Sequence, residues 1–366
     1  MTRPLRVALV GAGVIARQHG IVLGALRDEL ELVAVVDQDR ERADAFAAQH
    51  GGAVYRQLDE AIVGQRTRGE ELDLVVVCTP TGLHASVAIT ALEAGLHVII
   101  EKPADVTVER IDDIIAAQER AGTLVTVISQ HRFDPSTEIV TGAIRAGEFG
   151  RLTSGIASID WWRGQSYYDS GAWRGTWALD GGGALMNQGV HTVDLLVAAL
   201  GTPVEVFGYT DTLAHERVET EDVAVGVVRF ASGALGVIHA STAVYPGLIA
   251  RLQIHGTAGS AVIENDRLTY FHSTPAGTTA PEIRIGVQGG ATNQIDRFRG
   301  PDGADPWAGS SLPGQMTDAH LYQYRNLLAA LRGEEEVRVT LRDNRQAIAI
   351  ITGLYESART GRPVAI

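Results

Sequence analysis

The chain of 366 residues contains a single cysteine, Cys78. One thiol cannot form an internal disulfide and offers no cysteine partners for a zinc site, which indicates a reducing compartment. We therefore expect a cytoplasmic protein. Long apolar runs are missing as well: none approaches the roughly 18 to 20 residues that a membrane-spanning helix needs, so we expect no membrane partner.

Positive charge is scarce. Lys and Arg number 31 against 44 Asp and Glu, which gives a net charge of −13. A field of this sign repels polyanions, so we expect no nucleic-acid partner, although a local pocket for a small ligand can oppose the global sign. Hydrophobic residues make up 45% and charged residues 20%, as in ordinary globular proteins, and the length suggests two or three domains.

The first third of the chain alternates short apolar runs with amphipathic stretches, which is typical of strand and helix units around a parallel sheet. The expected strands are Leu5–Val10, Leu32–Val36, Leu74–Cys78, His97–Ile100 and Leu124–Ile128. The expected helices are Ile15–Arg27, Arg40–His50, Ser86–Ala94 and Val108–Ala121. The strand runs are apolar on both faces, as in strands that lie between two layers of helices.

Beyond about residue 130 strands follow one another with few helices between them, which favours an antiparallel sheet in an α+β domain. The expected strands are Arg151–Arg163, Val204–Tyr209, Asp222–Phe230, Ala234–Thr242, Ile249–His255 and Ala261–Asn265. The expected helices are Gly189–Leu200, Asp318–Arg332 and Asp343–Ser357. Ala231-Ser232-Gly233 predicts a hairpin turn. Ser273–Gly314 predicts a long loop, either a binding element or an oligomer arm.

A glycine-rich motif, Gly11-Ala12-Gly13-Val14-Ile15-Ala16, follows the first strand and opens the first helix. It matches the dinucleotide pattern G-x-G-x-x-G/A in the required context. Gly11 permits the tight turn, Gly13 lets the backbone approach a pyrophosphate, and Ala16 lets helix and strand pack closely. Together with Val14 and Ile15, which lead into the helix N-terminus, these residues are expected to contact the cofactor phosphates.

Asp37 ends the second strand, at the distance from the motif where a carboxylate accepts from both ribose hydroxyls. Its charge repels a 2′-phosphate, so we predict NAD rather than NADP. Arg40 could turn towards a 2′-phosphate, which leaves use of NADP open. The alternative interpretation is that Asp37 caps the next helix.

Two further segments follow parallel strands at the edge where open α/β sheets bind ligands. One is Thr79-Pro80-Thr81 with His84 downstream, and the other is Glu101-Lys102-Pro103. A lysine at the carboxyl end of a buried strand lies at the mouth of the crevice, partly desolvated and suited to proton transfer. The alternative is a surface lysine paired with Glu101.

These motifs resemble the Gfo/Idh/MocA oxidoreductases, together with Gln130-His131-Arg132-Phe133 and the run Gly181-Gly182-Gly183-Ala184-Leu185-Met186-Asn187-Gln188-Gly189-Val190-His191-Thr192-Val193-Asp194. The resemblance implies an α/β protein: a Rossmann domain, which we place at 1–128, and an α+β domain with a large, mostly antiparallel open sheet, which we place at 129–366. It also implies self-association into a homodimer or homotetramer, and hydride transfer between nicotinamide and a sugar or cyclitol carbon.

The resemblance assigns roles to individual residues. The lysine of E-K-P and the histidine of the later motif share proton transfer, which points to Lys102 and His191. The cofactor contacts that it adds to the glycine motif and Asp37 are Thr79, Pro80, Thr81, His84, Glu101 and Lys102. Inositol dehydrogenases of the family carry Asp four residues before the histidine, whereas this chain has Asn187, which cannot accept a proton at neutral pH.

The Met-Asn-Gln-x-x-His form, with Trp173-Arg174-Gly175-Thr176 upstream, is similar to members that act on hexopyranosides or nucleotide sugars, often at C3. Four of the five tryptophans lie between residues 161 and 177. Aromatic faces pack on sugars, while Arg and Tyr bind hydroxyl, carboxylate or phosphate groups. The alternative is a local aromatic core or a subunit contact. The predicted substrate contacts are Arg132, Trp162, Arg163, Tyr167, Arg174, Asn187, Gln188 and His191.

We therefore expect an NAD-dependent oxidoreductase acting on a secondary alcohol of a sugar, glycoside or nucleotide sugar, with C3 oxidation as the hypothesis. The alternatives are an inositol dehydrogenase, a glycosidase that keeps its NAD and uses transient C3 oxidation, and a non-catalytic NAD sensor. No catalytic metal is predicted, because His131, His191 and Asp194 show no spacing such as H-E-x-x-H. Asp194, three residues after His191, is expected to orient that histidine or to cap a contact.

Overall fold

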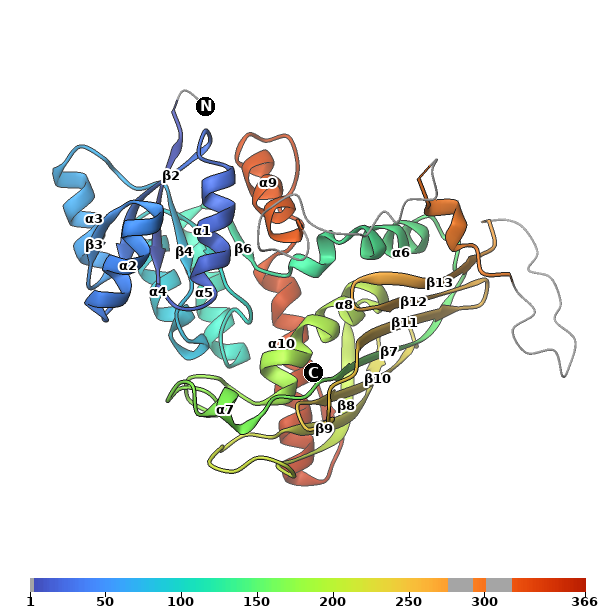
Figure 1. Cartoon of the computed structure of the whole chain (residues 1–366). Helices are drawn as coiled ribbons and strands as arrows, with labels where there is room; N and C mark the ends of the chain where they lie inside the picture. Colours follow the sequence, from blue (N-terminus) through green and yellow to red (C-terminus); the bar gives the residue numbers. More distant parts are fainter. Residues whose placement is uncertain (1–2, 276–291, 301–317) are drawn as a thin grey trace, which may run out of the picture. The chain divides into compact units, whose positions relative to one another are not determined.

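A computed structural model describes residues 3–275, 292–300 and 318–366, and these form two compact units (Figure 1). Of these residues, the first unit contains 3–130, 176–181 and 318–348, and the second contains 131–175, 182–275, 292–300 and 349–366. The division expected at 128/129 places 176–181 and 318–348 in the second domain, whereas backbone proximity groups them with the first. Most of the loop expected over Ser273–Gly314 lies outside the described residues.

The first unit is built on a parallel sheet of six strands in the order β3-β2-β1-β4-β5-β6. Its strands are β1 Leu5–Val10, β2 Leu30–Val36, β3 Ala53–Tyr55, β4 Leu74–Val77, β5 His97–Ile100 and β6 Val125–Val127. Val10 pairs with Val36 on one side and with Val77 on the other. The strand order reverses between β1 and β4, which is where such sheets bind ligands at their carboxyl edge. The predicted Rossmann fold is confirmed.

Helices alternate with these strands. They are α1 Ala16–Ala25, α2 Arg40–His50, α3 Leu58–Thr67, α4 His84–Glu93 and α5 Val108–Ala121. Every predicted helix and strand of this region is present with ends within two residues, while β3 and α3 were not predicted. Thr107 caps α5 by accepting from Arg110 N–H, and Gly122 ends that helix with a φ of 66°.

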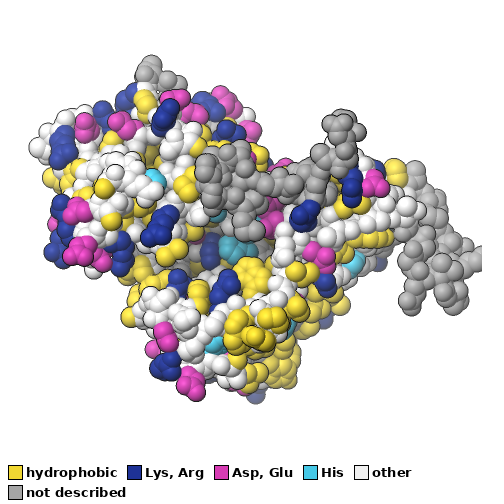
Figure 2. All heavy atoms as spheres, in the orientation of Figure 1, with side chains coloured by type: hydrophobic (Ala, Val, Ile, Leu, Met, Phe, Trp, Pro, Cys, Tyr) yellow, Lys and Arg dark blue, Asp and Glu magenta, His cyan; other side chains and the backbone are white. Residues whose placement is uncertain are grey.

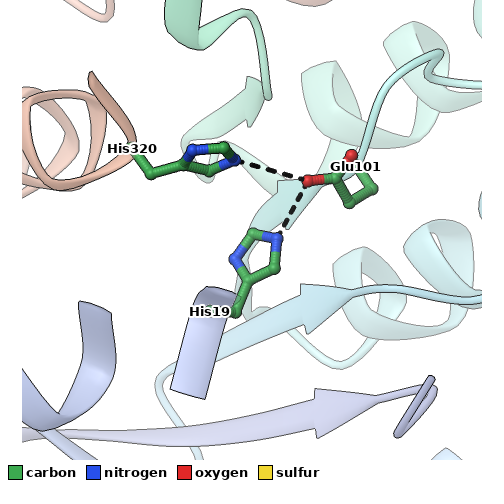
Figure 3. A group of neighbouring side chains, drawn as sticks. All are labelled: His19, Glu101 and His320. Atoms are coloured by element: carbon green, nitrogen blue, oxygen red, sulfur yellow. Dashed lines mark hydrogen bonds and ion pairs between the residues drawn. The ribbon is translucent and has the colours of Figure 1, made fainter. Parts of the chain in front are cut away.

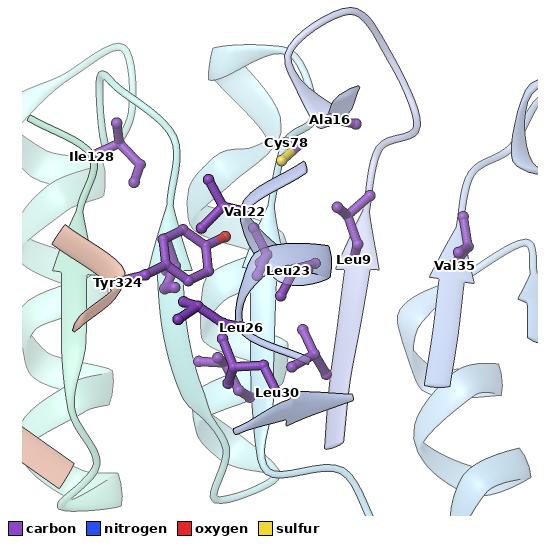
Figure 4. Close-up of a cluster of buried hydrophobic side chains, with 14 of the residues drawn as sticks. Leu9, Ala16, Val22, Leu23, Leu26, Leu30, Val35, Cys78, Ile128 and Tyr324 are labelled. Carbon is purple, nitrogen blue, oxygen red and sulfur yellow. The ribbon is translucent and has the colours of Figure 1, made fainter. Parts of the chain in front are cut away.

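The core of the first unit includes a helix from much later in the chain, α9 (Ala319–Leu331). Its Tyr324 is 1% exposed and packs in one cluster with Val22, Leu26 and Leu30 (Figure 4). Burying a leucine side chain contributes about 1.5 to 3 kcal/mol. This shared cluster explains why residues 318–348 belong to the first unit although they follow the second domain in sequence.

The second unit contains a sheet of eight strands in the order β13-β12-β11-β7-β10-β9-β8-β14. Its strands are β7 Leu152–Asp160, β8 Pro203–Asp211, β9 Val223–Phe230, β10 Leu235–Ser241, β11 Ala250–Gly256, β12 Gly259–Glu264, β13 Arg267–Ser273 and β14 Val364–Ala365. All neighbours are antiparallel except β7 and β10, so the mostly antiparallel sheet is confirmed. The hairpin turn between β9 and β10 is also confirmed: Phe230 N–H donates to Ala234 and Gly233 has a φ of 86°.

Further helices of the second unit are α6 Pro135–Arg145, α7 Gln165–Tyr168 and α8 Val190–Leu200, and α10 (Leu341–Thr360) begins in the first unit and ends in the second. A π-helical turn, Ala184–Gly189, leads directly into α8. α6, α7, β13 and β14 were not predicted. None of the helices among the described residues is long and apolar enough to cross a bilayer.

The two faces of the eight-stranded sheet differ. On the covered face Leu354 of α10 fits over Gly208 and Gly226, where an added Cβ would lie 2.8 and 2.5 Å from its methyl carbons. The opposite face exposes a group of hydrophobic side chains, which we call the apolar sheet face: Tyr209, Val225, Val227, Leu235 and Val237, each between 43% and 63% exposed. Hydrophobic side chains gather over the strands of this unit in Figure 2.

Candidate active site

The glycine motif forms the loop between β1 and α1. Gly11 has a φ of 94°, and an added Cβ would lie 2.6 Å from the carbonyl oxygen of Cys78, so both conformation and space require glycine. Gly13 has no atom within 4 Å of its Cβ position, and this open space beside the backbone is where a phosphate group can approach. Val14 is 75% exposed, so it contributes nothing to the core.

Asp37 binds the glycine loop. Its carboxylate accepts from Ala12 N–H at 2.8 Å and from Asp39 N–H at 2.9 Å. The alternative interpretation of Asp37 as the cap of α2 is wrong, because Asp39 is the residue that caps this helix, accepting from Arg42 N–H at 3.1 Å. A carboxylate has about four acceptor positions, so Asp37 can still accept from a ribose hydroxyl.

The arginine beside Asp37 is not the one singled out from the sequence. Arg40 pairs with Asp44 at 2.9 Å along the exposed face of α2. Arg42 places a guanidinium nitrogen 3.8 Å from the Asp37 carboxylate. The i,i+4 spacing of Arg40 and Asp44 could have signalled their pairing, whereas the approach of Arg42 depends on how α2 leaves β2.

The segment after β4 also fits a dinucleotide. The Thr79 hydroxyl oxygen is buried and has no hydrogen-bond partner among the described residues, and a buried polar atom normally has one. A ligand at this edge of the sheet would supply it. The orphaned hydroxyl and the open space at Gly13 are two independent features that suit bound NAD, with Gly11, Gly13, Asp37 and Thr79 as the residues that would hold it.

His84 connects the two segments that follow β4 and β5. Its Nδ1 lies 2.8 Å from the carbonyl oxygen of Pro103 and its Nε2 lies 2.8 Å from that of Thr79. Burial lowers the pKa of His84, although both carbonyls act in the opposite direction, so the neutral ring donates to one carbonyl at a time. The ring thus fixes the spacing of the two loops, and its direct contact with the cofactor stays a prediction.

Glu101, the residue before Lys102, is buried, with 4% of its surface exposed. One Glu101 oxygen accepts from Lys102 N–H at 3.0 Å. The other lies 2.9 Å from His19 Nε2 and 3.9 Å from His320 Nε2 (Figure 3). His19 Nδ1 lies 2.7 Å from the Tyr324 hydroxyl. Lys102 is therefore attached to α1 and α9 through a buried network that the sequence did not reveal.

The pKa values of Glu101 and His19 are shifted in the directions that favour an ion pair between them. Burial alone would raise the pKa of Glu101, but His19 and His320 hold it well below its usual value. Burial lowers the pKa of His19, yet Cys78, Tyr324 and Glu101 together hold it well above its usual value. Glu101 and His19 therefore form a buried ion pair. The second carboxylate oxygen of Glu101 accepts from the backbone N–H of Lys102.

Five predicted substrate residues meet in one network of the second unit. The Gln188 amide donates to Tyr167 at 3.1 Å and to Asn187 at 3.0 Å. Arg163 donates to Gln188 at 3.3 Å, and Arg174 donates to the Tyr167 hydroxyl at 2.8 Å. These residues come from the segment after β7, from α7 and the segment after it, and from the π-helical turn. The structure thus brings together side chains that are up to 25 residues apart.

The two arginines of this network lie on aromatic rings. Arg163 lies 5.0 Å from the ring centre of Trp161, and Arg174 lies 4.4 Å from those of Tyr167 and Trp173. Neither guanidinium forms an ion pair with a carboxylate in the part of the chain that the structure describes. Two uncompensated cations among aromatic faces are suited to an anionic ligand.

Trp162 belongs to a different aromatic group. Its ring lies against His215 and Tyr245, at centroid distances of 5.7 and 5.4 Å. Arg163 therefore shares a side with Trp161, as alternation along an extended segment requires. The predicted contact between Trp162 and substrate stays a prediction.

His191 lies near the start of α8, and its ring contacts His131 edge to face at 5.0 Å. His131 Nδ1 lies 2.9 Å from both Asp134 and Asp266. Burial lowers the pKa of His131, but these two carboxylates outweigh it and raise the pKa to about 10. His191 thus packs against a protonated imidazole that residue spacing did not predict.

Arg132 and Asp194 form a bidentate pair, with both distances 2.7 Å. Arg132 and Asp194 are 62 positions apart. The helical spacing from which we expected Asp194 to orient His191 or cap a contact could therefore not reveal Arg132 as its partner. Contact of Arg132 with substrate stays a prediction. Among the described residues, two groups have metal-ligand side chains in proximity, His19-Glu101-His320 and His131-Asp134-Asp266, and both are hydrogen-bonded ion pairs here.

Fold and site define an NAD-binding oxidoreductase. The model of an oxidoreductase family with an NAD-binding Rossmann fold, GFO/IDH/MocA, matches residues 5–129, and that of the GFO/IDH/MocA C-terminal domain matches residues 139–262. The chain belongs to this family. The family resemblance inferred from the motifs is confirmed.

Several relatives have named activities. The D-apiose dehydrogenase of Paraburkholderia graminis is 27% identical over 98% of this chain and 88% of its own. The D-glucoside 3-dehydrogenase of Escherichia coli is 31% identical over 55% of each. The solved WlbA dehydrogenase of Chromobacterium violaceum, in complex with NADH and UDP-GlcNAcA, is 30% identical with a TM-score of 0.85, over 100% of this chain and 97% of its own.

The Glu101 network yields a prediction about stability. Glu101→Gln leaves the His19 imidazolium buried without its counter-charge, so we expect the free energy of unfolding at pH 7 to fall by about 3 to 5 kcal/mol. The difference from wild type should shrink below about pH 4, because a carboxylate with a lowered pKa stabilises the fold only while it is ionised. Urea denaturation at several pH values measures both effects.

The matched control is Glu93→Gln, the same substitution at an exposed position of α4, which should change stability by less than about 0.5 kcal/mol. Equal effects of the two substitutions would contradict a buried ion pair at Glu101.

Proposed function

We propose that this oxidoreductase oxidises a ring hydroxyl, at C3, of a sugar that carries an anionic group, with a nucleotide sugar as the favoured class. The observation that carries the proposal is the network around Tyr167, in which Arg163 and Arg174 have no carboxylate partner among the described residues. In a chain with a net charge of −13, two such cations side by side need a stabilising anion, which a phosphate or carboxylate of the substrate supplies.

The aromatic rings of the network suit the sugar itself. Trp161, Tyr167 and Trp173 present faces on which the C–H groups of a pyranose ring can pack. Asn187 can orient a hydroxyl without removing its proton, which argues against the inositol dehydrogenase alternative. The solved WlbA relative was crystallised with a nucleotide sugar acid and NADH, which supports both the anionic group and the cofactor.

Oxidation of a secondary alcohol needs a base for the hydroxyl proton. We assign the proton to Lys102 and His191 on the strength of the family pattern. The Glu101 network would fix the backbone of Lys102, and the π-helical turn and α8 would fix His191. Bound NAD supplies the acceptor for the hydride that leaves the same carbon.

The residues around Asp37 favour NAD over NADP. The Asp37 carboxylate, which also binds the glycine loop at Ala12, would accept from the adenine ribose hydroxyls and repel a 2′-phosphate. Arg42, 3.8 Å away, neutralises part of this charge, so we expect a preference for NAD rather than complete exclusion of NADP. Parallel assays with the two cofactors measure this preference, and faster turnover with NADP would contradict it.

The proposed substrate class is tested by NADH absorbance with wild-type protein, NAD and a matched set of sugars. UDP-GlcNAcA has a carboxylate and a diphosphate, UDP-GlcNAc has the diphosphate alone, and methyl glucoside is neutral. We expect the highest kcat/KM for an anionic sugar. Arg163→Gln and Arg174→Gln should each lower that kcat/KM by about 10- to 100-fold, the effect of losing a hydrogen bond to a charged group.

The control is Arg217→Gln, which removes the same charge from an exposed residue paired with Asp169 and should leave kcat/KM unchanged. A neutral sugar as the preferred substrate, or equal losses in all three variants, would contradict the proposed anion site. Release of aglycone with no net NADH would identify the glycosidase alternative instead.

We also propose that the chain associates with a second copy of itself through the apolar sheet face. Val227 pairs with Val237 on one neighbouring strand and with Phe207 on the other, which makes a continuous apolar row across β8, β9 and β10. Exposed patches of this kind are typical of subunit interfaces. An open sheet face suits a second copy of the same face, because a two-fold axis makes the patch complementary to itself.

Light scattering tests this association. The wild-type mass should be a multiple of the 39.0 kDa chain, and Val227→Lys together with Val237→Lys should reduce it, because burying two lysines in the interface is unfavourable. Val63→Lys, at a 63% exposed position of α3, is the control and should not change the mass. A wild-type mass of one chain would contradict the proposal.

We propose a cytoplasmic location because the chain has a single thiol. Cys78 is buried and free, and no disulfide exists that would require an oxidising compartment. Fractionation of the native cells tests this, and recovery in an extracytoplasmic fraction would contradict it.

A further inference from the structure

Glu221 lies two residues before the start of β9 in the second unit and is 4% exposed. One carboxylate oxygen accepts from Gly183 N–H at 2.9 Å, and the other accepts from Leu185 N–H at 2.7 Å and from the Tyr355 hydroxyl at 3.0 Å. The backbone carbonyl of Glu221 accepts from Ala184 N–H at 3.0 Å. Three successive N–H groups of one segment are therefore bound by a single distant residue.

The glycines that precede the π-helical turn are explained by this contact. A Cβ at Gly183 would lie 1.7 Å from the Glu221 carbonyl oxygen, and a Cβ at Gly182 would lie 2.1 Å from the Tyr355 hydroxyl. A side chain at Gly183 would overlap the Glu221 backbone, so this position requires glycine, and one at Gly182 would displace the Tyr355 ring. The backbone must approach Glu221 and Tyr355 this closely for the three hydrogen bonds to form.

The segment that Glu221 binds carries the proposed substrate contacts. Asn187 and Gln188 lie in the π-helical turn, and His191 follows in the first turn of α8. The first N–H groups of a helix have no partners within it, and neither the π-helical turn nor α8 has a side-chain cap of its own. Glu221 supplies that cap from a different part of the chain.

We propose that Glu221 is a positioning residue for the reaction, because its carboxylate, bonded to Gly183 N–H, Leu185 N–H and Tyr355 O–H, fixes the turn that presents the substrate contacts. We call this arrangement the Glu221 cap. The inference rests on the proposed function for its catalytic consequence, whereas the cap itself can be measured without any substrate. Glu221 itself touches neither substrate nor cofactor in this account.

The cap depends on the ionised carboxylate. Burial raises the pKa of Glu221 to about 7, although the N–H groups of Leu185 and Gly183 and the Tyr355 hydroxyl favour the ionised form. Because a protonated carboxyl uses one oxygen as a donor, it cannot bind the same three donors. The cap should therefore weaken as the pH falls through about 7.

Other ionisable groups near Glu221 do not replace it. Tyr168 of α7 lies close enough to interact with it electrostatically, and burial raises the pKa of that phenol beyond the neutral range. Asp222, next in the chain, is bonded to His215 and to three backbone N–H groups, and burial of its carboxylate is outweighed by these donors, which lower its pKa. Tyr355 of α10 donates to Glu221 directly.

The experiment is hydrogen–deuterium exchange of the full chain, followed by mass spectrometry of the peptide containing residues 183–190. In Glu221→Gln we expect at least tenfold faster exchange of this peptide at pH 8. The glutamine amide has an NH2 group in place of one carboxylate oxygen, and this group cannot accept from a backbone N–H. Exchange in wild type, corrected for the intrinsic effect of pH, should accelerate between pH 8 and pH 6, and in Glu221→Gln it should not.

Tyr355→Phe serves as a second variant, since it removes one donor without changing the shape of the side chain. It should give an intermediate exchange rate and shift the wild-type midpoint to higher pH, and it keeps the test decisive if Glu221→Gln fails to fold. Glu216→Gln, at an 85% exposed side chain, is the control. Exchange of residues 183–190 at the wild-type rate in both Glu221→Gln and Tyr355→Phe would overturn the proposal.

Kinetics separate positioning from simple structural support. With the sugar that the panel identifies, Glu221→Gln should lower kcat/KM at least tenfold while the Kd for NADH, measured by fluorescence, changes less than twofold. Unchanged kcat/KM with faster exchange would overturn the positioning role. If no sugar reacts, the proposed function fails while the exchange measurement still decides whether the Glu221 cap exists.

Discussion

Hydrogen bonds from backbone N–H groups to buried or half-buried acidic side chains hold the loops on which the candidate chemistry depends. Asp37 binds the glycine loop at Ala12, Glu101 binds the backbone of Lys102, and Glu221 binds the π-helical turn at Gly183 and Leu185. Loops at strand ends leave N–H groups unpaired. A buried carboxylate satisfies several of them at once and forms stronger bonds than a neutral acceptor does.

The buried carboxylates of Glu101 and Glu221 differ in the groups that stabilise their charge. Buried carboxylates are costly unless they are bonded, and Glu101 meets that condition through His19 whereas Glu221 relies on backbone donors and Tyr355. The two acids consequently differ in the direction of their pKa shifts. The Arg163 and Arg174 side chains differ from these acids, since their hydrogen bonds are to neutral groups and they lie on aromatic rings. The proposed anionic substrate would supply the missing counter-charge.

The sequence predicted those parts of the fold and site that depend on local patterns. Apolar periodicity located most strands of both sheets but missed β3, β13 and β14, and the glycine motif located the turn at Gly11. The Glu101–His19 and Glu221–Gly183 contacts could not be predicted, because they join residues 82 and 38 positions apart and depend on how helices pack. Arg42 replaced Arg40 beside Asp37 for the same reason, and α9 joined the first unit through Tyr324, whose core neighbours precede it by about 300 residues.

Lys102, fixed by Glu101, is proposed to accept the proton of the sugar hydroxyl while hydride leaves the carbon that bears this hydroxyl. The most direct test compares Lys102→Met with wild type in NADH formation and in NADH binding. The account predicts a loss of kcat of about 100- to 10,000-fold, the usual contribution of a general base, with the Kd for NADH within about threefold of wild type. Turnover at the wild-type rate in Lys102→Met would contradict it.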